Sequence, residues 1–359
     1  MLIDLLIYYS AGEILRLGGN VYDVGLLREV MIGNGYAEAL EVIAFPAPPM
    51  MLYLFSFLSL FPFPVAACAW SLLNVAIVQK TIANISCVSS LSSFSTLHLG
   101  QRMVLLLSFW PVWKALYFGQ TSLIVMSCVV YSNFLLSRGR NFAAGLVLSG
   151  MWFKPQFMAP IFGILLVAAF QRRLWTLFTG FSVASAVHAL LTLSIQPEVY
   201  TRFLSQNHTI AQHLDMSSAS LVDFIALTVG IDLPLWLPIV LGVSGGVLIA
   251  ARLGMERDLL VRAVLPLCLL SAPYGWSHDY VLILYHYLFL GTKAFARRGE
   301  RSVLGLIMIQ VFVNAVLLAT AEEAYTFWFP ILISLGTFIE GRNKPNIRTT
   351  TASPTKTSR

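Results

Sequence analysis

The chain of 359 residues is too apolar for an ordinary soluble protein. Hydrophobic residues make up 57% of it, charged residues only 11%, and the mean hydropathy is +0.77; soluble domains are roughly 25% charged. The net charge of +6 is carried by short basic clusters between apolar runs. That pattern is typical of membrane-protein loops and not of a groove that follows nucleic-acid phosphates. We expect a polytopic membrane protein that binds no nucleic acid.

Residues 1–45 are predicted to form an extracytoplasmic amphipathic segment. Residues 4–17 have the pattern of an amphipathic helix that ends at Gly18 and lies on the membrane surface. Phe45 to Pro49 would begin the next helix, because proline lacks the amide proton needed to continue a preceding one.

Thirteen apolar stretches follow, each approaching the roughly 20 residues that a membrane helix needs. Their predicted bounds are 46–61, 64–79, 81–98, 102–117, 121–137, 142–153, 156–171, 174–195, 233–251, 259–272, 279–296, 302–320 and 325–340. We expect about 11–13 of them to cross the membrane in an all-α bundle over residues 46–340. Residues 341–359 are predicted to be a disordered cytoplasmic tail, because they are rich in polar and basic residues.

The charges of the loops predict the orientation. Lys and Arg in short loops mark the cytoplasmic side. If successive spans cross the membrane in alternating directions, the basic loops at 138–140, 172–173 and 293–301 all lie on that side. The same alternation places outside residues 1–45, 118–121, 154–155, 196–232, 271–279 and 321–324. We therefore expect a multi-pass protein of the plasma (inner) membrane.

Four polar residues that played no part in this assignment fall on the outer side, namely Asp4, Gln120, Lys154 and His278. An ionisable group costs about 2.5–3.5 kcal/mol at the bilayer centre, so such groups usually face a cavity or a partner. The four residues are thus predicted to share one extracytoplasmic site. Structural interpretations stay open: Asp4 could cap its helix, Lys154 could extend to the interface, and Trp276 could belong to an interfacial aromatic belt.

No cofactor or metal is expected. The four cysteines form no CxxC pair, and the histidines outside the 273–279 turn show no metal-ligand spacing. Neither a Walker motif nor GxGxxG occurs, so a nucleotide sugar held by a Rossmann unit is not the expected donor.

The polar motifs occur in a characteristic order. The first motif consists of Asp4, Tyr8 and Ala11. It is followed by a Gly-x-x-x-Tyr-Asp motif that ends at Asp23 and by a Tyr-Pro-Pro-like helix start at Phe45 to Pro49. The later motifs are Gly119-Gln120, Ala143-Ala144-Gly145 leading to Lys154-Pro155, and a Ser-Pro-x-x-Trp-x-His-His-like turn at Ser271 to Asp279. In this order the chain resembles the glycosyltransferase 87 family over most of its length.

The resemblance implies a GT-C-like helical membrane fold with an extracytoplasmic active site. It implies an inverting mannosyltransferase that takes a hexose from a polyprenyl-phosphate donor and gives it to a lipid or glycan acceptor. Asp4 would be the general base and Lys154 would neutralise the donor phosphate. The remaining donor- or acceptor-binding residues would be Tyr8, Gln120, Trp276, His278 and Asp279.

Two departures from the family pattern stand out. Asp279 occupies the place of the second histidine of the usual pair, which argues against a role that needs two imidazoles. Asp4 lies at the start of the chain, whereas family members have a full transmembrane helix before it. We expect either a helix encoded upstream of Met1 or a truncated, inactive copy. A transporter or lipid flippase is the other alternative, although internal repeats, which are usual in that class, are not evident.

Overall fold

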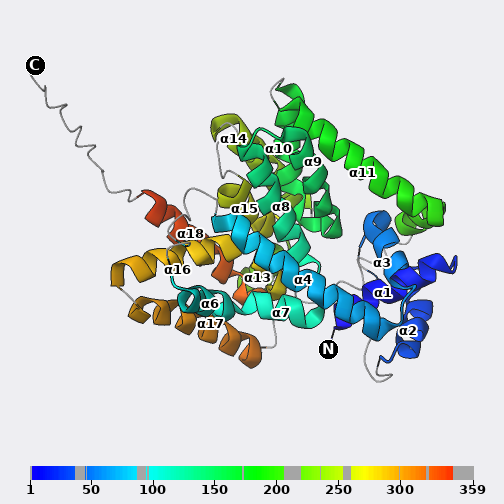
Figure 1. The fold of residues 1–359 in the computed structure, drawn as a ribbon, viewed down its shortest axis with the longest axis horizontal. Helices are drawn as coiled ribbons and strands as arrows, with labels where there is room; N and C mark the ends of the chain where they lie inside the picture. The colour runs from blue at the N-terminus through cyan, green and yellow to red at the C-terminus, as the bar shows by residue number, and fades with distance from the viewer. Residues whose placement is uncertain are drawn as a thin grey trace, which may run out of the picture.

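The computed structural model of the chain is entirely helical in the part that it describes (Figure 1). It describes residues 2–36, 45, 47–86, 94, 97–171, 174–205, 220–234, 236–253, 260–298, 300–320 and 323–342. The predicted all-α class is therefore confirmed for these ranges. The predicted tail, apart from residues 341 and 342, lies outside the described residues.

In chain order, the elements are α1 (Ile3–Arg16), α2 (Val24–Gly33), η1 (Pro49–Met51), α3 (Leu52–Leu58), α4 (Phe63–Ser86), α6 (Leu99–Ser108), α7 (Trp110–Phe118), α8 (Ser122–Ser137), α9 (Asn141–Leu148), η3 (Ser149–Phe153), η4 (Pro155–Phe157), α10 (Ala159–Phe170), α11 (Trp175–Ile195), α13 (Leu221–Val229), α14 (Trp236–Leu253), η5 (Leu260–Val264), α15 (Leu265–Leu270), η6 (Ser277–Ile283), α16 (Leu284–Arg298), α17 (Glu300–Thr320), η7 (Glu323–Thr326) and α18 (Trp328–Arg342).

Among the described helices, α4 and α11 contain stretches long and apolar enough to cross a membrane, at Phe63–Asn84 and Trp175–Ile195. Large apolar side chains on α11 recur at the spacing of helical turns and face away from the protein. Val183, Val187 and Leu190 are 49%, 47% and 64% exposed. Such a face needs an apolar surrounding, which a lipid bilayer provides. The other apolar helices are shorter, so the predicted 11–13 crossings are only partly supported.

The helices between residues 46 and 98 differ from the predicted spans. η1 and α3 form a short helical piece in place of the span 46–61, and α4 runs through the predicted boundary at residue 80. The separation of spans 64–79 and 81–98 is wrong, because residues 65–86 contain no glycine or proline that would end a helix. Polar residues such as Lys80, which is exposed, do not break it.

Two of the stretches predicted to lie outside, residues 1–45 and 196–232, contact each other. α1 matches the predicted helix 4–17 and ends before Gly18, whose φ of +77° suits a helix terminus. Gln196 Nε2 and Arg202 Nη1 both donate to the carbonyl of Gly19, at 2.8 and 3.0 Å. Residues of the two stretches share a second hydrophobic core that includes Leu6, Ile14, Leu27 and Val199.

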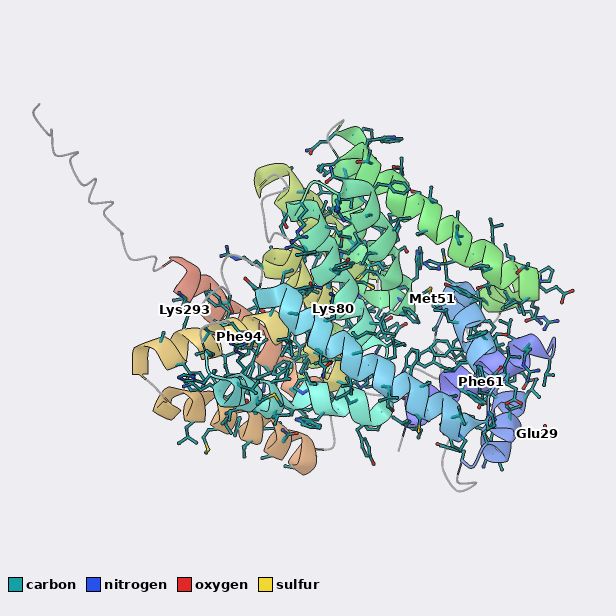
Figure 2. The ribbon with its side chains drawn as sticks, viewed as in Figure 1. Glu29, Met51, Phe61, Lys80, Phe94 and Lys293 are labelled. Carbon is teal, nitrogen blue, oxygen red and sulfur yellow. The ribbon has the colours of Figure 1, made fainter. Side chains whose placement is uncertain are left out.

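This N-terminal unit forms one end of the molecule, where α1, α2 and α3 lie beside the end of α11 (Figure 1). Figure 2 shows Glu29 at this end and Lys293 at the opposite end of the long axis. The main hydrophobic core lies between these ends and includes Leu123 and Val125 of α8 and Tyr280 of η6. Helix α8 contacts α4, α9, η3, η5 and η6, which makes it the central element of the bundle.

Helix α1 crosses α3 at a very short distance. A Cβ atom at Gly12 would lie 2.3 Å from the carbonyl carbon of Phe55, so only glycine fits there. Beside this crossing, Tyr9 Oη donates to the carbonyl of Phe61 at 2.8 Å and Arg16 Nε donates to Ser59 Oγ at 3.3 Å. These contacts fix the position of α1, and with it the position of Asp4 in its first turn.

Replacing Gly12 by alanine should lower the thermal unfolding midpoint, because the added methyl group would overlap the α3 backbone. Overpacking of this kind costs roughly 1–3 kcal/mol. Gly33→Ala is the matched control, since a Cβ atom there meets nothing within 4 Å. Thermal unfolding followed by circular dichroism in detergent should show a lower midpoint for Gly12→Ala and an unchanged midpoint for Gly33→Ala. Equal midpoints for the two variants would contradict the close crossing.

Candidate functional site

A cavity of about 300 Å³ opens between α1, α7, the connection from α7 to α8, the segment of η3 and η4, the turn 273–279 and η7. Six of the seven predicted site residues line it, namely Asp4, Tyr8, Gln120, Lys154, Trp276 and His278. The seventh, Asp279, is fully buried directly behind the wall and contacts Lys154. The structure therefore brings together side chains that are up to 275 positions apart in the sequence.

The first wall of the cavity forms where α1 meets the connection between α7 and α8. Gly119 ends α7 with a φ of +72°, and a Cβ atom there would lie 2.8 Å from Leu5 Cβ. Because glycine stands at this position, the first turn of α1 can approach the connection. The Gln120 amide then donates a hydrogen bond to Asp4 Oδ2, and Trp70 Nε1 donates to the Gly119 carbonyl at 2.9 Å.

Tyr8 follows Asp4 by one helical turn, so both side chains share the face of α1 that borders the cavity. The Tyr8 ring stacks on Phe55 of α3 at 4.8 Å between centroids. Burial raises the pKa of Asp4 to about 6, while the Lys154 charge and the Gln120 hydrogen bond oppose that shift. Asp4 is thus a carboxylate that can take up and release a proton near neutral pH.

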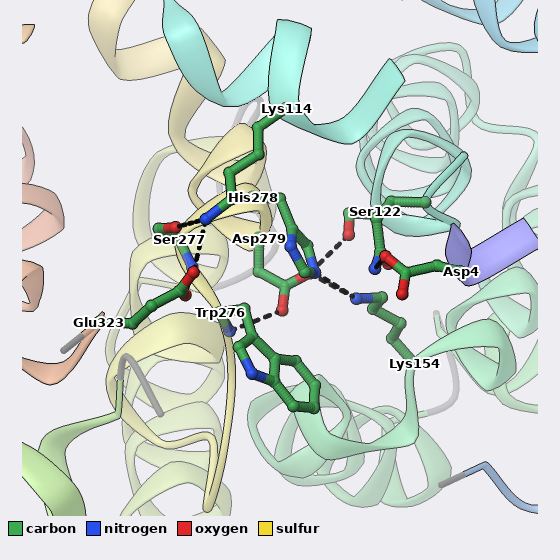
Figure 3. A network of polar contacts seen from close by, with 10 residues as sticks. Asp4, Lys114, Ser122, Lys154, Trp276, Ser277, His278, Asp279 and Glu323 are labelled. Carbon is green, nitrogen blue, oxygen red and sulfur yellow. Dashed lines mark hydrogen bonds and ion pairs between the residues drawn. The ribbon is translucent and has the colours of Figure 1, made fainter. Parts of the chain in front are cut away.

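Lys154 lies between η3 and η4 with φ −141° and ψ 78°, outside the helical region. The cause is Pro155, whose ring disfavours a helical conformation in the residue before it. Lys154 Nζ lies 2.6 Å from Asp279 Oδ1 and 3.4 Å from His278 Nε2 (Figure 3). The Lys154 and Asp279 side chains are only 4% and 1% exposed, so this is a buried ion pair.

Asp279 organises the turn that carries the aromatic side chains. Besides Lys154, it accepts hydrogen bonds from Ser122 Oγ at 2.5 Å and from the Trp276 amide at 3.1 Å. The Trp276 and His278 rings stack at 5.9 Å between centroids. Burial lowers the pKa of His278 to about 3, although the Asp279 charge opposes the shift. The imidazole is therefore neutral at pH 7 and acts through hydrogen bonds.

A second ion pair borders the cavity on the other side of this turn (Figure 3). Lys114 of α7 lies 2.5 Å from Glu323 Oε1 of η7 and donates to Ser277 Oγ at 2.5 Å. The Ser277 amide donates to Glu323 Oε2, also at 2.5 Å. Each side chain of the pair is 21% exposed, so water screens this pair more than it screens the pair of Lys154 with Asp279.

The sequence predictions missed Lys114, Glu323 and Ser122. Lys114 had a usable signal, because it is a charged residue inside the predicted apolar span 102–117, whereas Arg102 stands at the edge of that span. Glu323 had no such signal in the sequence, since it stands in a short loop whose neighbours in space are far away along the chain. Among the described residues, no group of three or more His, Cys, Asp or Glu is placed to hold a metal ion.

Breaking the buried pair should cost far more than removing both charges. Lys154→Met or Asp279→Leu alone leaves one buried charge without a partner, which typically costs about 3–5 kcal/mol. The double variant removes both charges, so its loss of thermal stability should be smaller than the sum of the two single losses. Thermal unfolding of the four proteins in detergent measures this coupling. Additive losses would show that the two side chains do not depend on each other.

One comparison with known proteins identifies the family. The sequence profile described as Glycosyltransferase family 87 matches residues 45–273, which is more than half of the chain. No curated protein and no solved structure matches it. The matched range contains Gln120 and Lys154, whereas Asp4, Tyr8 and the residues from Trp276 onward lie outside it. The family resemblance is confirmed, and the chain belongs to glycosyltransferase family 87 as a membrane glycosyltransferase.

Proposed function

We propose that the chain transfers a hexose, mannose first of all, from a polyprenyl-phosphate donor to a lipid or glycan acceptor with inversion. The observation that carries this proposal is the cavity in which the Asp4 carboxylate, the buried cation Lys154 and the Trp276–His278 stack border one space. Binding sites for small ligands are typically apolar cavities with a few convergent polar groups. The family membership supports the glycosyl transfer itself.

Asp4 is the proposed general base. In an inverting transfer, the acceptor oxygen forms a bond to the anomeric carbon while the bond from that carbon to the phosphate oxygen breaks. The hydroxyl proton goes to Asp4, and the electron pair of the broken bond stays on the departing polyprenyl phosphate. A pKa of about 6 leaves Asp4 mostly ionised at pH 7 and still basic enough to accept the proton. The Gln120 amide holds the carboxylate in place.

Lys154 is the proposed cation beside the donor phosphate. Its pairing with Asp279 compensates its charge, and an ammonium carries three N–H donors, so Lys154 can contact Asp279 and a phosphate oxygen together. A fixed cation stabilises the negative charge that grows on the leaving phosphate. Neutral His278 would add a hydrogen bond, while Tyr8 and Trp276 would offer aromatic surfaces to the sugar.

We propose further that this is a multi-pass protein of the plasma (inner) membrane with a GT-C-like bundle and an extracytoplasmic site. Helices α4 and α11, each long and apolar enough to cross a membrane, support the membrane domain. Further support for the orientation comes from the contact of the helix that carries Asp4 with Val199, because both belong to stretches predicted to lie outside. The segment 1–45 would lie outside and residues 46–340 would form the membrane domain.

The full chain in phospholipid vesicles should move labelled mannose from polyprenyl-phosphate-mannose to a bacterial lipid and glycan extract. Asp4→Asn should reduce this transfer about 10²–10⁴-fold, because the variant lacks the base. Glu13→Gln on the same helix is the matched control: its side chain can still accept from Asn34 Nδ2 and does not line the cavity. If the donor crosses the vesicle membrane without being consumed, the protein is a flippase and the proposal is wrong.

The transfer rate should fall as pH drops through about 6. Protonated Asp4 cannot accept the acceptor proton, and burial raises the pKa of Asp4 to about 6. The profile of kcat/KM between pH 5 and pH 8 should therefore have an acid limb near that value. A profile that stays flat down to pH 5 would contradict a base whose pKa is about 6.

A further inference from the structure

Lys114 is better placed than Lys154 to change partners. Both lysines line the cavity, but the Lys114 side chain is 21% exposed and the Lys154 side chain only 4%. An ion pair that solvent partly screens is weak, whereas a fully buried pair is costly to separate. Of the two cations, Lys114 can therefore turn toward an incoming anion at the smaller cost.

Glu323 would stay in place if Lys114 moved. Its Oε2 atom accepts a hydrogen bond from the Ser277 amide at 2.5 Å, which is independent of Lys114. Lys114 in turn keeps an oxygen partner in Ser277 Oγ at 2.5 Å. The pair thus has one fixed member and one member on a long flexible side chain, which is the arrangement needed for an exchange of partners.

Lys114 lies near two aromatic rings of α7, and one of them belongs to the wall of the cavity. Its Nζ atom lies 5.9 Å from the centroid of Phe118, a residue that also lines the cavity. The Phe118 ring in turn lies 6.3 Å from the His278 ring. Lys114 and Lys154 therefore approach His278 from two different sides, as Figure 3 shows.

We propose that Lys114 binds a non-bridging oxygen of the donor phosphate, and that Glu323 neutralises Lys114 only while the site is empty. This inference rests on the proposed function. The charge of the leaving group supports it: a phosphodiester donor carries one negative charge, and the monoester that departs carries between one and two near pH 7. Asp279 already compensates Lys154, so a second cation is needed as that charge grows.

The two members of the pair should have opposite effects on phosphate binding. Lys114→Gln should weaken binding of farnesyl phosphate to the purified full chain about tenfold or more, because a charge-assisted hydrogen bond is lost. Lys114→Arg should restore most of it. Glu323→Gln should strengthen binding, because it frees Lys114 while the glutamine oxygen still accepts from the Ser277 amide. Isothermal titration calorimetry in detergent measures all four proteins.

Several controls separate phosphate recognition from a structural role. Farnesol, which lacks the phosphate, should bind wild type and Lys114→Gln equally. Lys80→Gln, at an exposed lysine of α4 that does not line the cavity, should leave farnesyl phosphate binding unchanged. Weaker binding in both Lys114→Gln and Glu323→Gln would overturn the inference, because a merely structural pair predicts that result. If inorganic phosphate binds as tightly as farnesyl phosphate, the proposal of a lipid-linked donor is wrong.

Failure of this inference differs from failure of the proposed function. If the wild type transfers mannose and binds farnesyl phosphate, but the Lys114 and Glu323 variants bind it equally well, Lys114 is not a phosphate ligand and the transfer proposal stands. If the wild type neither binds farnesyl phosphate nor transfers mannose, the proposed function itself is wrong.

Discussion

The buried ion pair between Lys154 and Asp279 is the interaction on which the site depends. Lys154 projects inward because Pro155 prevents a helical conformation at that residue. Its charge is tolerable there only because Asp279 lies 2.6 Å away. Asp279 also binds Ser122 and the Trp276 amide, so the same carboxylate joins α8, the Lys154 loop and the aromatic turn.

This pair also changes the charge of the cavity. Asp279 adds a negative charge, which is paired with Lys154. The second lysine, Lys114, is likewise balanced, by Glu323, and His278 is neutral because burial lowers its pKa. In the described residues around the cavity, Asp4 is left as the carboxylate without a matching cation, which suits a group that must exchange a proton.

The position of the Asp4 carboxylate depends on how helix α1 packs. Helix α1 packs on α3 at Gly12 and on the α7–α8 connection at Gly119, two contacts that any larger side chain would block. Its far end is held by Gln196 through the carbonyls of Gly18 and Gly19. Asp4 is therefore positioned by contacts from three separate parts of the chain.

From the sequence alone one could predict the all-α class, the amphipathic helix at residues 4–17 and the candidate residues from Asp4 to Asp279, because hydrophobicity, helix periodicity and local motifs are properties of neighbouring residues. The prediction failed at residue 80, where polar side chains resemble a loop but α4 continues to Ser86. Only the tertiary structure decided that Asp279 pairs with Lys154, and that Lys114 meets Glu323 from 209 positions away. Such pairings depend on how distant helices pack, which no local pattern of residues encodes.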